Sequence, residues 1–264
     1  MTVDPGSHVG FDVVNLGVFD REVVEALLRL LDPGELGIDA GANIGQNTSI
    51  MALAAGPAGR VAAFEPQPAA LRLLERNVDR WASFELAPIE IVPRALSDRE
   101  GMAVLCEGAD LGGARLESVP PASMAHGGPS GKRFDVEVTT LDAFLPDARP
   151  VGLLKIDVEG HEAAVLAGAR RLLGAGRVRD VVFEDFDPQP GHPTRILQAA
   201  GYAVFGLVST WSRPSLVALS DCGRRRGHRP SNFVATRDPA RAIARLERRG
   251  WSCLRIEARA RGDR

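Results

Sequence analysis

The segment LGIDAGANIGQNT, residues 36–48, joins a short apolar run to a glycine-rich turn and to the start of a helical pattern. The apolar run at 36–40 predicts a strand, and the residues from 46 to 55 predict a helix. Gly41 and Gly45 let the backbone turn tightly and let a ligand approach without a Cβ in the way. A strand that turns into a helix in this manner is the usual ligand crevice of an open α/β sheet.

Acidic residues stand at the ends of the first two predicted strands. Asp39 ends the first and can accept hydrogen bonds from a cationic amine. Glu65 ends the second strand, twenty residues after Gly45, where a carboxylate can accept both hydroxyl protons of an adenosine ribose. The spacing therefore predicts an adenosine-containing ligand.

Two ligand classes use this layout, and the loop separates them. A dinucleotide site is typified by G-x-G-x-x-G, whereas this chain has D-x-G-x-N-x-G, with Ala42 and Asn43 where a further glycine is expected. An acidic residue just before the loop also repels a pyrophosphate. The pattern suits S-adenosylmethionine, which is cationic; glycines that serve only a tight turn are the alternative.

Outward from this segment, short apolar runs alternate with helical patterns, which predicts βαβ units and a parallel sheet. The predicted helices are 21–31, 46–55, 68–81, 162–173, 193–200 and one that begins at Asp238-Pro239. The predicted strands are 36–40, 60–65, 89–94, 134–139, 152–157, 181–184, 202–207 and 231–236, with 134–139 as an edge strand.

The chain is expected to form one main domain. We divide it into an N-terminal helical segment (1–35), the α/β domain (36–237) and a basic C-terminal helix and tail (238–264). Residues 97–133 are rich in Gly, Pro and Ser, and they predict an inserted loop that serves as a substrate lid or as a merely flexible insertion.

Several stretches resemble the FkbM-type methyltransferases, class I enzymes that use S-adenosylmethionine. The resemblance spans about 36–173 and is carried by DAGANIGQNT (39–48), AFEPQPAALRLLERN (63–77), RALSDREG (94–101), TTLDAFL (139–145) and LLKIDVEGHEAAVLAGA (153–169). The KIDVEGHE portion is much more specific than the glycine-rich turn alone.

The resemblance implies a Rossmann-like class I fold with a seven-stranded, mostly parallel sheet, a final reversed strand and helices on both faces. It implies methyl transfer to a hydroxyl of a sugar or a secondary metabolite. By position, the residues that would bind the cofactor are Asp39, Gly41, Asn43 and Gly45 on the methionine and ribose side, Glu65 at the ribose, and Ala95, Leu96 and Ser97 beside the adenine.

Acidic and basic side chains gather at the end of the strand 152–157, which in this fold faces the sulfonium. Alternation places Lys155 and Asp157 on one face of the strand, and Glu159 and His161 follow in the loop. An alcohol is a poor nucleophile until a base accepts its proton. We expect Asp157 to lie nearest the cofactor, with His161 or Glu159 as the base; the family pattern does not fix a histidine at position 161.

Structural explanations compete at the same strand end. Lys155 is expected to neutralise Asp157 or Glu184, and Glu162 suits the first turn of a helix. Asp157, Glu159 and Glu184 would also suit Mg²⁺, which takes carboxylate oxygens. Nothing fixes octahedral spacing, so no metal site is assigned.

Composition and charge exclude several classes of protein. The chain has 264 residues, 45% of them hydrophobic and 25% charged, which is typical of a globular protein and not of collagen, coiled coils or disordered chains. Three cysteines without C-x-x-C spacing predict neither a disulfide framework nor a zinc site. The lack of a signal pattern or a long apolar run predicts a cytoplasmic protein without membrane partners.

The net charge of −2 hides an asymmetry. Residues 223–264 contain 13 arginines and four acidic residues, a balance of +9, while the rest of the chain carries −11. Without an aromatic ladder or a nucleic-acid motif, this tail is interpreted as a solvated arginine surface and not as a nucleic-acid site.

The sequence thus predicts an S-adenosylmethionine-dependent O-methyltransferase with a small hydroxylated acceptor. A nicotinamide-dependent oxidoreductase and a catalytically silent module that binds S-adenosylmethionine are the alternatives. A methylase of amino groups on DNA or protein is disfavoured, because the sequence lacks an Asn/Asp-Pro-Pro-Tyr/Phe motif. The sequence leaves a homo-oligomer open.

Overall fold

The structure is a computed structural model of the chain. It describes residues 1–3, 8–107, 113–116, 132–147, 149–186, 190–222 and 230–255.

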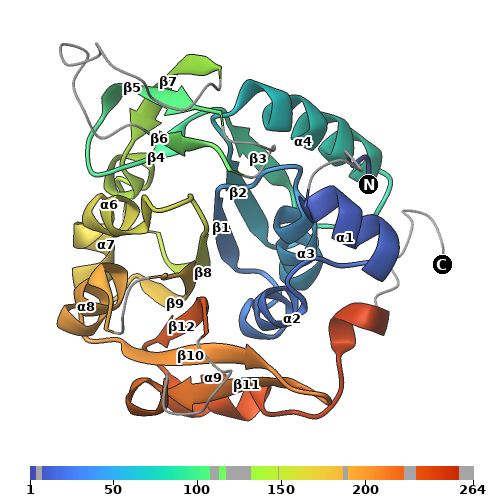
Figure 1. Ribbon diagram of the computed structural model, residues 1–264, viewed down its shortest axis with the longest axis vertical. Helices are drawn as coiled ribbons and strands as arrows, with labels where there is room; N and C mark the ends of the chain where they lie inside the picture. Colours follow the sequence, from blue (N-terminus) through green and yellow to red (C-terminus); the bar gives the residue numbers. More distant parts are fainter. Residues whose placement is uncertain are drawn as a thin grey trace.

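A mixed sheet of eight described strands forms the centre of the protein (Figure 1). Its order is β11-β10-β12-β9-β8-β1-β2-β3. The strands are β1 (Leu36–Ala40), β2 (Arg60–Phe64), β3 (Ile89–Val92), β8 (Val151–Ile156), β9 (Val178–Glu184), β10 (Ala203–Ser209), β11 (Pro214–Ala218) and β12 (Asn232–Thr236).

The run from β3 to β9 is parallel, whereas β12 is antiparallel to both of its neighbours, β9 and β10. The predicted α/β fold and the reversed final strand are therefore confirmed. The predicted number of seven strands is wrong by one, because β11 extends the sheet as a hairpin with β10. The turn at Ser209–Pro214 that makes this hairpin has no periodic apolar pattern to reveal it.

A second sheet has the order β4-β7-β5-β6. It consists of β4 (Ala95–Leu96), β5 (Gly101–Cys106), β6 (Arg115–Leu116) and β7 (Arg133–Thr139). Two expectations are corrected here. The first part of the predicted loop 97–133 is a strand, and the predicted edge strand lies inside this second sheet, between β4 and β5. Residues 108–112 and 117–131 of the predicted lid lie outside the described residues.

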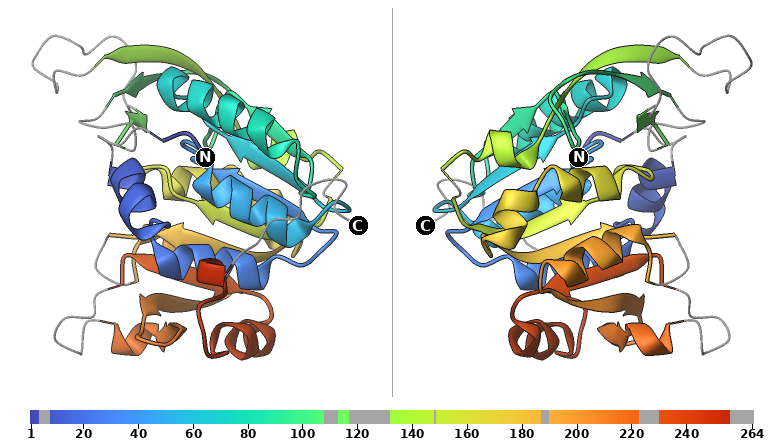
Figure 2. Two further views of the ribbon diagram at one scale, coloured as in Figure 1. Left: turned by 90° about the vertical axis from the view of Figure 1, so that its right-hand side faces the viewer. Right: turned by 90° about the vertical axis from the view of Figure 1, so that its left-hand side faces the viewer.

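Helices cover both faces of the main sheet (Figures 1 and 2). On one face lie α2 (Arg21–Leu30), α3 (Gln46–Ala55) and α4 (Pro68–Trp81), with α9 (Pro239–Leu246) packed on α2. On the other face lie α6 (Glu162–Ala167), α7 (Arg170–Gly174) and α8 (His192–Ala199). The remaining described helices are α1 (His8–Leu16), α5 (Leu141–Phe144), η2 (Leu219–Asp221) and η3 (Ser252–Arg255).

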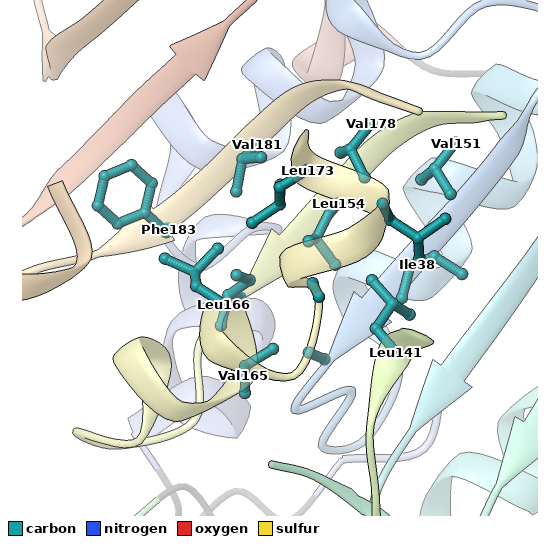
Figure 3. Close-up of a cluster of buried hydrophobic side chains, with 14 of the residues drawn as sticks. Ile38, Leu141, Val151, Leu154, Val165, Leu166, Leu173, Val178, Val181 and Phe183 are labelled. Carbon is teal, nitrogen blue, oxygen red and sulfur yellow. The ribbon is translucent and has the colours of Figure 1, made fainter. Parts of the chain in front are cut away.

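The core follows from the strand sequences. All residues of β1 and β8 are buried, because parallel strands covered on both faces require continuous apolar runs. Figure 3 shows Leu154 of β8 between Val181 of β9 and Ile38 of β1, with Leu166 and Leu173 of α6 and α7 packed over them. This core fixes the strand ends on which the site is built.

The predicted helix 162–173 is divided into α6 and α7 at Gly168. A Cβ on Gly168 would lie 1.9 Å from the carbonyl oxygen of Ser97, so only glycine permits this close approach. The carboxylate of Asp142 then accepts the amides of Arg171 and Leu172 at 2.7 and 3.0 Å and starts α7. The apolar period continues through the break, which is why the sequence predicts one helix.

Two arginines of α9, within the basic C-terminal segment, are held in ion pairs. Arg241 donates to the buried carboxylate of Asp180 at 2.8 Å and to Asp32 at 2.7 Å. Arg245 also pairs with Asp32, and Arg237 stacks on Tyr202, 4.7 Å from its ring centre. For Arg241 and Arg245 the interpretation is wrong, because they join α9 to β9 and to Asp32 after α2, whereas Arg237 is exposed. Residues 223–229 and 256–264 lie outside the described residues.

Candidate functional site

A cavity of about 350 Å³ opens at the carboxyl ends of β1, β2, β8 and β9. This volume lies within the range of small-molecule sites. It sits where the strand order reverses around β1, as expected for a ligand crevice of an open α/β sheet. Leu96, Leu105 and Leu116 of the second sheet supply an apolar wall. The predicted lid region thus contributes to the site through its described strands.

The loop after β1 presents backbone and one amide side chain to this cavity. Gly41 and Asn43 line it, and both have left-handed backbone conformations, with φ of 78° and 51°. The amides of Gly41 and Ala42 both donate to the carbonyl oxygen of Phe64, at 3.0 and 2.9 Å. The loop is therefore fixed to the end of β2 before any ligand is present.

Gly45 belongs to the same loop but does not line the cavity. Its φ is 94°, and a Cβ there would lie 2.7 Å from Leu74 and 2.9 Å from Trp81 on α4. The structure places Gly45 where the start of α3 packs on α4. Its described contacts are structural, and it supports the loop from behind.

Asp39 lies below the cavity floor and pairs with Lys155. The carboxylate of Asp39 is fully buried, accepts a hydrogen bond from Thr48 at 2.6 Å and lies 3.1 Å from the Nζ atom of Lys155. Lys155 is 2% exposed and also donates to the carbonyl oxygen of Gly41 at 2.8 Å. Burial lowers the pKa of Lys155, but the charges of Asp39 and Asp157 outweigh it, so the net shift is upward and the ammonium stays charged.

Glu65 brings its carboxylate to the cavity at the end of β2. Its two oxygens accept the amides of Asn43 and Gln67, at 2.7 and 2.8 Å. Burial raises the pKa of Glu65 to about 7 and outweighs these two hydrogen bonds, which lower it. The group is thus held in place with lone pairs left for a ligand.

Only two of the three residues predicted beside the adenine line the cavity. Ala95 and Leu96 of β4 line the cavity, whereas Ser97 is 3% exposed and outside the lining. The hydroxyl of Ser97 lies 2.9 Å from Nε2 of His161. Ser97 therefore connects β4 to the loop after β8.

Two of the three predicted catalytic residues line the cavity. Asp157 and Glu159 line the cavity, and Asp157 lies 3.5 Å from the Nζ atom of Lys155, which confirms the expected neutralisation. His161 is outside the lining, with Nε2 directed to Ser97, and burial lowers its pKa. Glu162 accepts the amides of Val158 and Gly160 at 3.2 and 3.0 Å, so it stabilises the loop as a first-turn residue.

Several residues of the lining were not predicted as site residues. They include Phe19, Phe64, Gln67, Arg94 and Phe186. Glu184, which the sequence analysis names only as a partner of Lys155 or a ligand of Mg²⁺, also lines the cavity, at the end of β9. Phe19 precedes α2 and is fixed by Gln46, whose side chain exchanges two hydrogen bonds with its backbone, at 2.8 and 2.9 Å.

Buried polar atoms without partners identify the kind of ligand that fits. Oδ1 of Asn43 and both polar side-chain atoms of Gln67 have no hydrogen-bond partner among the described residues. Buried polar groups normally have partners. Both residues line the cavity, beside Glu65, so a ligand with hydroxyl and amine donors and with ring-nitrogen acceptors fits here. S-Adenosylmethionine has these groups.

Among the described residues, no group of three or more His, Cys, Asp or Glu side chains is arranged to hold a metal ion.

Within the same residues, no helix is both long enough and apolar enough to cross a bilayer.

Comparison with known proteins identifies one family model. The model, described as the methyltransferase FkbM domain, matches residues 39–204, more than half of the chain. No match was found among curated proteins.

Three solved structures illustrate the likeness in fold. A putative rRNA methylase from Clostridium thermocellum is 10% identical, with a TM-score of 0.46, over 81% of this chain and 92% of that one. A precorrin-6y C5,15-methyltransferase from Geobacter metallireducens is 16% identical, with a TM-score of 0.44, over 82% and 88% of the two chains. An S-adenosylmethionine-dependent O-methyltransferase from Thermotoga maritima is 15% identical, with a TM-score of 0.44, over 87% and 71%. At this level of likeness these structures do not identify the acceptor.

Proposed function

Since the chain belongs to the FkbM methyltransferase family and is an S-adenosylmethionine-dependent methyltransferase, we propose that it methylates a hydroxyl of a sugar or a secondary metabolite. The observation that carries this proposal is the group of carboxylates at the cavity end formed by β8 and β9, beside the apolar wall of the second sheet. A hydroxyl must lose its proton during methyl transfer, and carboxylates at this place are the groups able to take it.

The residues proposed to hold S-adenosylmethionine follow from the geometry. Glu65 is proposed to accept the ribose hydroxyls, and Asn43 and Gln67 offer buried polar atoms that have no partner among the described residues. Ala95 and Leu96 offer an apolar surface for the adenine. Asp39, Gly45 and Ser97, which lie outside the lining, are proposed to support these residues and not to contact the cofactor.

The bound cofactor supplies an electrophilic methyl group on a positively charged sulfur. The protein has to orient the acceptor oxygen towards that methyl group, exclude water and receive the hydroxyl proton. Asp157 follows β8 and is paired with Lys155, so it is proposed to set the negative field at the methyl-donating end of the cavity. That field favours the cationic cofactor.

The other functions considered differ in what they bind. A nicotinamide-dependent oxidoreductase would bind NAD, and a silent module would bind S-adenosylmethionine without turnover. An RNA acceptor would require a basic surface around the cavity. The described cavity rim instead carries Asp157, Glu159 and Glu184, with Arg94 tied to Glu137 at 2.9 Å. This favours a small hydroxylated acceptor without nucleic acid.

The proposed reaction predicts a methyl group on oxygen. The purified chain is incubated with methyl-labelled S-adenosylmethionine and, separately, with hydroxylated sugars, hydroxylated macrolides, amines and structured RNA. Mass spectrometry and NMR of the products are expected to show labelled methyl ethers with a hydroxylated compound. Label on nitrogen or on RNA alone would contradict the proposal, and binding of S-adenosylhomocysteine without any transfer would favour the silent module.

A further inference from the structure

The four carboxylates that line the described cavity differ in how they are held. Glu65 accepts two backbone amides, and Asp157 is paired with Lys155. Glu159 lies 3.9 Å from Arg115. Glu184 receives neither a hydrogen bond nor an ion pair from the described part of the chain. A proton acceptor needs a lone pair directed at the cavity, and both oxygens of Glu184 are without a hydrogen-bond partner among the residues that the structure describes.

Glu184 lines the same cavity as Asp157, which we propose to mark the methyl-donating end. In the parallel pair of β8 and β9, Ile156 is opposite Phe183, and Asp157 and Glu184 are the residues that directly follow these two. They therefore leave the ends of neighbouring strands, which run about 4.8 Å apart. Phe186, two residues further, also lines the cavity and is 70% exposed. Glu184 therefore stands between the proposed cofactor end and an aromatic rim.

Asp20 adds a further negative charge near Glu184. It belongs to the N-terminal segment, which lies outside the residues 39–204 that match the family model. It precedes α2 with φ of 47° and ψ of 63°, and its side chain does not cap the helix. Asn232, which is opposite Glu184 on β12, lies near this carboxylate and lowers its pKa, although burial and nearby negative charges raise it more. The backbone of the neighbouring Phe19 is fixed by Gln46. The fixed backbone of Phe19 thus holds Asp20 near Glu184 and Asp157.

We propose that Glu184 is the group that accepts the proton of the acceptor hydroxyl, and that Asp20 is a positioning residue that acts on Glu184 through its charge. This inference rests on the proposed function of hydroxyl methylation. In the step, the acceptor oxygen forms its bond to the methyl carbon, the carbon–sulfur bond breaks with its electron pair left on sulfur, and the hydroxyl proton moves to Glu184. No further reactant is needed.

The charges around Glu184 suit this role. Burial raises its pKa, and the negative charges of Asp157, Asp20 and Glu159 raise it further, while Lys155 lowers it. These groups come from β8, from the loop after β8 and from the segment before α2; Asn232 faces Glu184 from β12 without a charge. Burial likewise raises the pKa of Asp20, to about 6, so Asp20 is charged above neutral pH. A base with a raised pKa has more affinity for the proton that it must receive.

The first test is a titration of the protein without cofactor. Carbon-13 NMR of glutamate carboxylates, with Glu184 assigned by its absence in Glu184→Gln, is expected to give a midpoint of about 8 for Glu184. In Asp20→Asn the midpoint is expected to move to lower pH, because loss of a nearby negative charge favours the ionised form. Asp79→Asn, an exposed carboxylate on α4, is the control and should not move it. An ordinary midpoint near 4.3 for Glu184, or no response to Asp20→Asn, would overturn the proposal.

The second test uses the acceptor found with labelled cofactor. Glu184→Gln is expected to lower kcat by about 10²- to 10⁴-fold, the usual contribution of a general base, with unchanged affinity for S-adenosylhomocysteine. Glu184→Asp should recover part of the rate. In Asp20→Asn the acid limb of the kcat/KM profile should move to lower pH.

The outcomes separate the two proposals. Full turnover by Glu184→Gln, or an acid limb that persists in this variant and disappears in His161→Ala, would overturn the role of Glu184 alone. Absence of methyl transfer to any hydroxyl by the wild-type chain would instead overturn the proposed function, and with it the role of Glu184 in that reaction.

Discussion

Replacement of Lys155 by methionine is expected to lower the free energy of unfolding by about 3–5 kcal/mol, the usual cost of removing one partner from a buried ion pair. Lys155 is 2% exposed, and the carboxylate of Asp39 beside it is fully buried. Methionine fills a similar volume but leaves that carboxylate without its countercharge. The carbonyl oxygen of Gly41 also loses its donor at 2.8 Å.

Chemical denaturation measures this effect, and the chain offers a matched control. Lys132 is the other lysine of the sequence and is exposed, so Lys132→Met should change stability by less than about 0.5 kcal/mol. Adding Asp39→Asn to Lys155→Met should restore part of the loss, because the uncompensated charge is removed. Equal effects of the two lysine substitutions would show that the buried pair is not the reason.

Gly41→Ala is expected to reduce the affinity for S-adenosylhomocysteine by more than tenfold. Gly41 has a φ of 78°, and a Cβ there would lie 1.9 Å from the carbonyl oxygen of Asp157. The alanine would therefore push the loop away from the end of β8, where Gly41 and Asp157 line the same cavity. The conformational penalty of about 1 kcal/mol adds to this displacement.

The control separates steric displacement from backbone strain. Gly34 has a φ of 86°, but a Cβ there would have no atom within 4 Å. Gly34→Ala should therefore lose about 1 kcal/mol of stability and keep its affinity for S-adenosylhomocysteine in calorimetry. If Gly41→Ala binds as tightly as Gly34→Ala, the loop after β1 does not form the cofactor site.

The sequence was sufficient for the parts of the fold that local patterns encode. The buried parallel strands read as apolar runs, and the acidic strand end at Glu65 and the loop from Gly41 to Gly45 have fixed spacings. The second sheet was missed because β4 and β6 have only two residues each and a stretch rich in Gly, Pro and Ser, 117–131, separates β6 from β7 in the sequence. The arginines of α9 were misread because their partners, Asp32 and Asp180, are distant in sequence.

The part of the site that could not be predicted depends on contacts between residues far apart in the sequence. Phe19 meets Gln46 across 27 residues, and His161 meets Ser97 across 64 residues. The second contact directs the ring of His161 away from the cavity lining, although its ordinary pKa suggested a base. The raised pKa values of Glu65 and Glu184 are also invisible in the sequence, because burial and charged neighbours from several elements cause them.

Calorimetric titration of the wild-type chain and of Glu65→Ala with S-adenosylhomocysteine, and of the wild type with NAD, tests the central claim most directly. The claim is that the cavity at the carboxyl ends of β1, β2, β8 and β9 binds S-adenosylmethionine. We expect one S-adenosylhomocysteine site per wild-type chain, no NAD binding, and a loss of about 1–3 kcal/mol in Glu65→Ala, because hydrogen bonds to a charged group disappear. That loss is roughly 5- to 150-fold in Kd. Equal affinity of the two chains, or binding of NAD in place of S-adenosylhomocysteine, would contradict the claim.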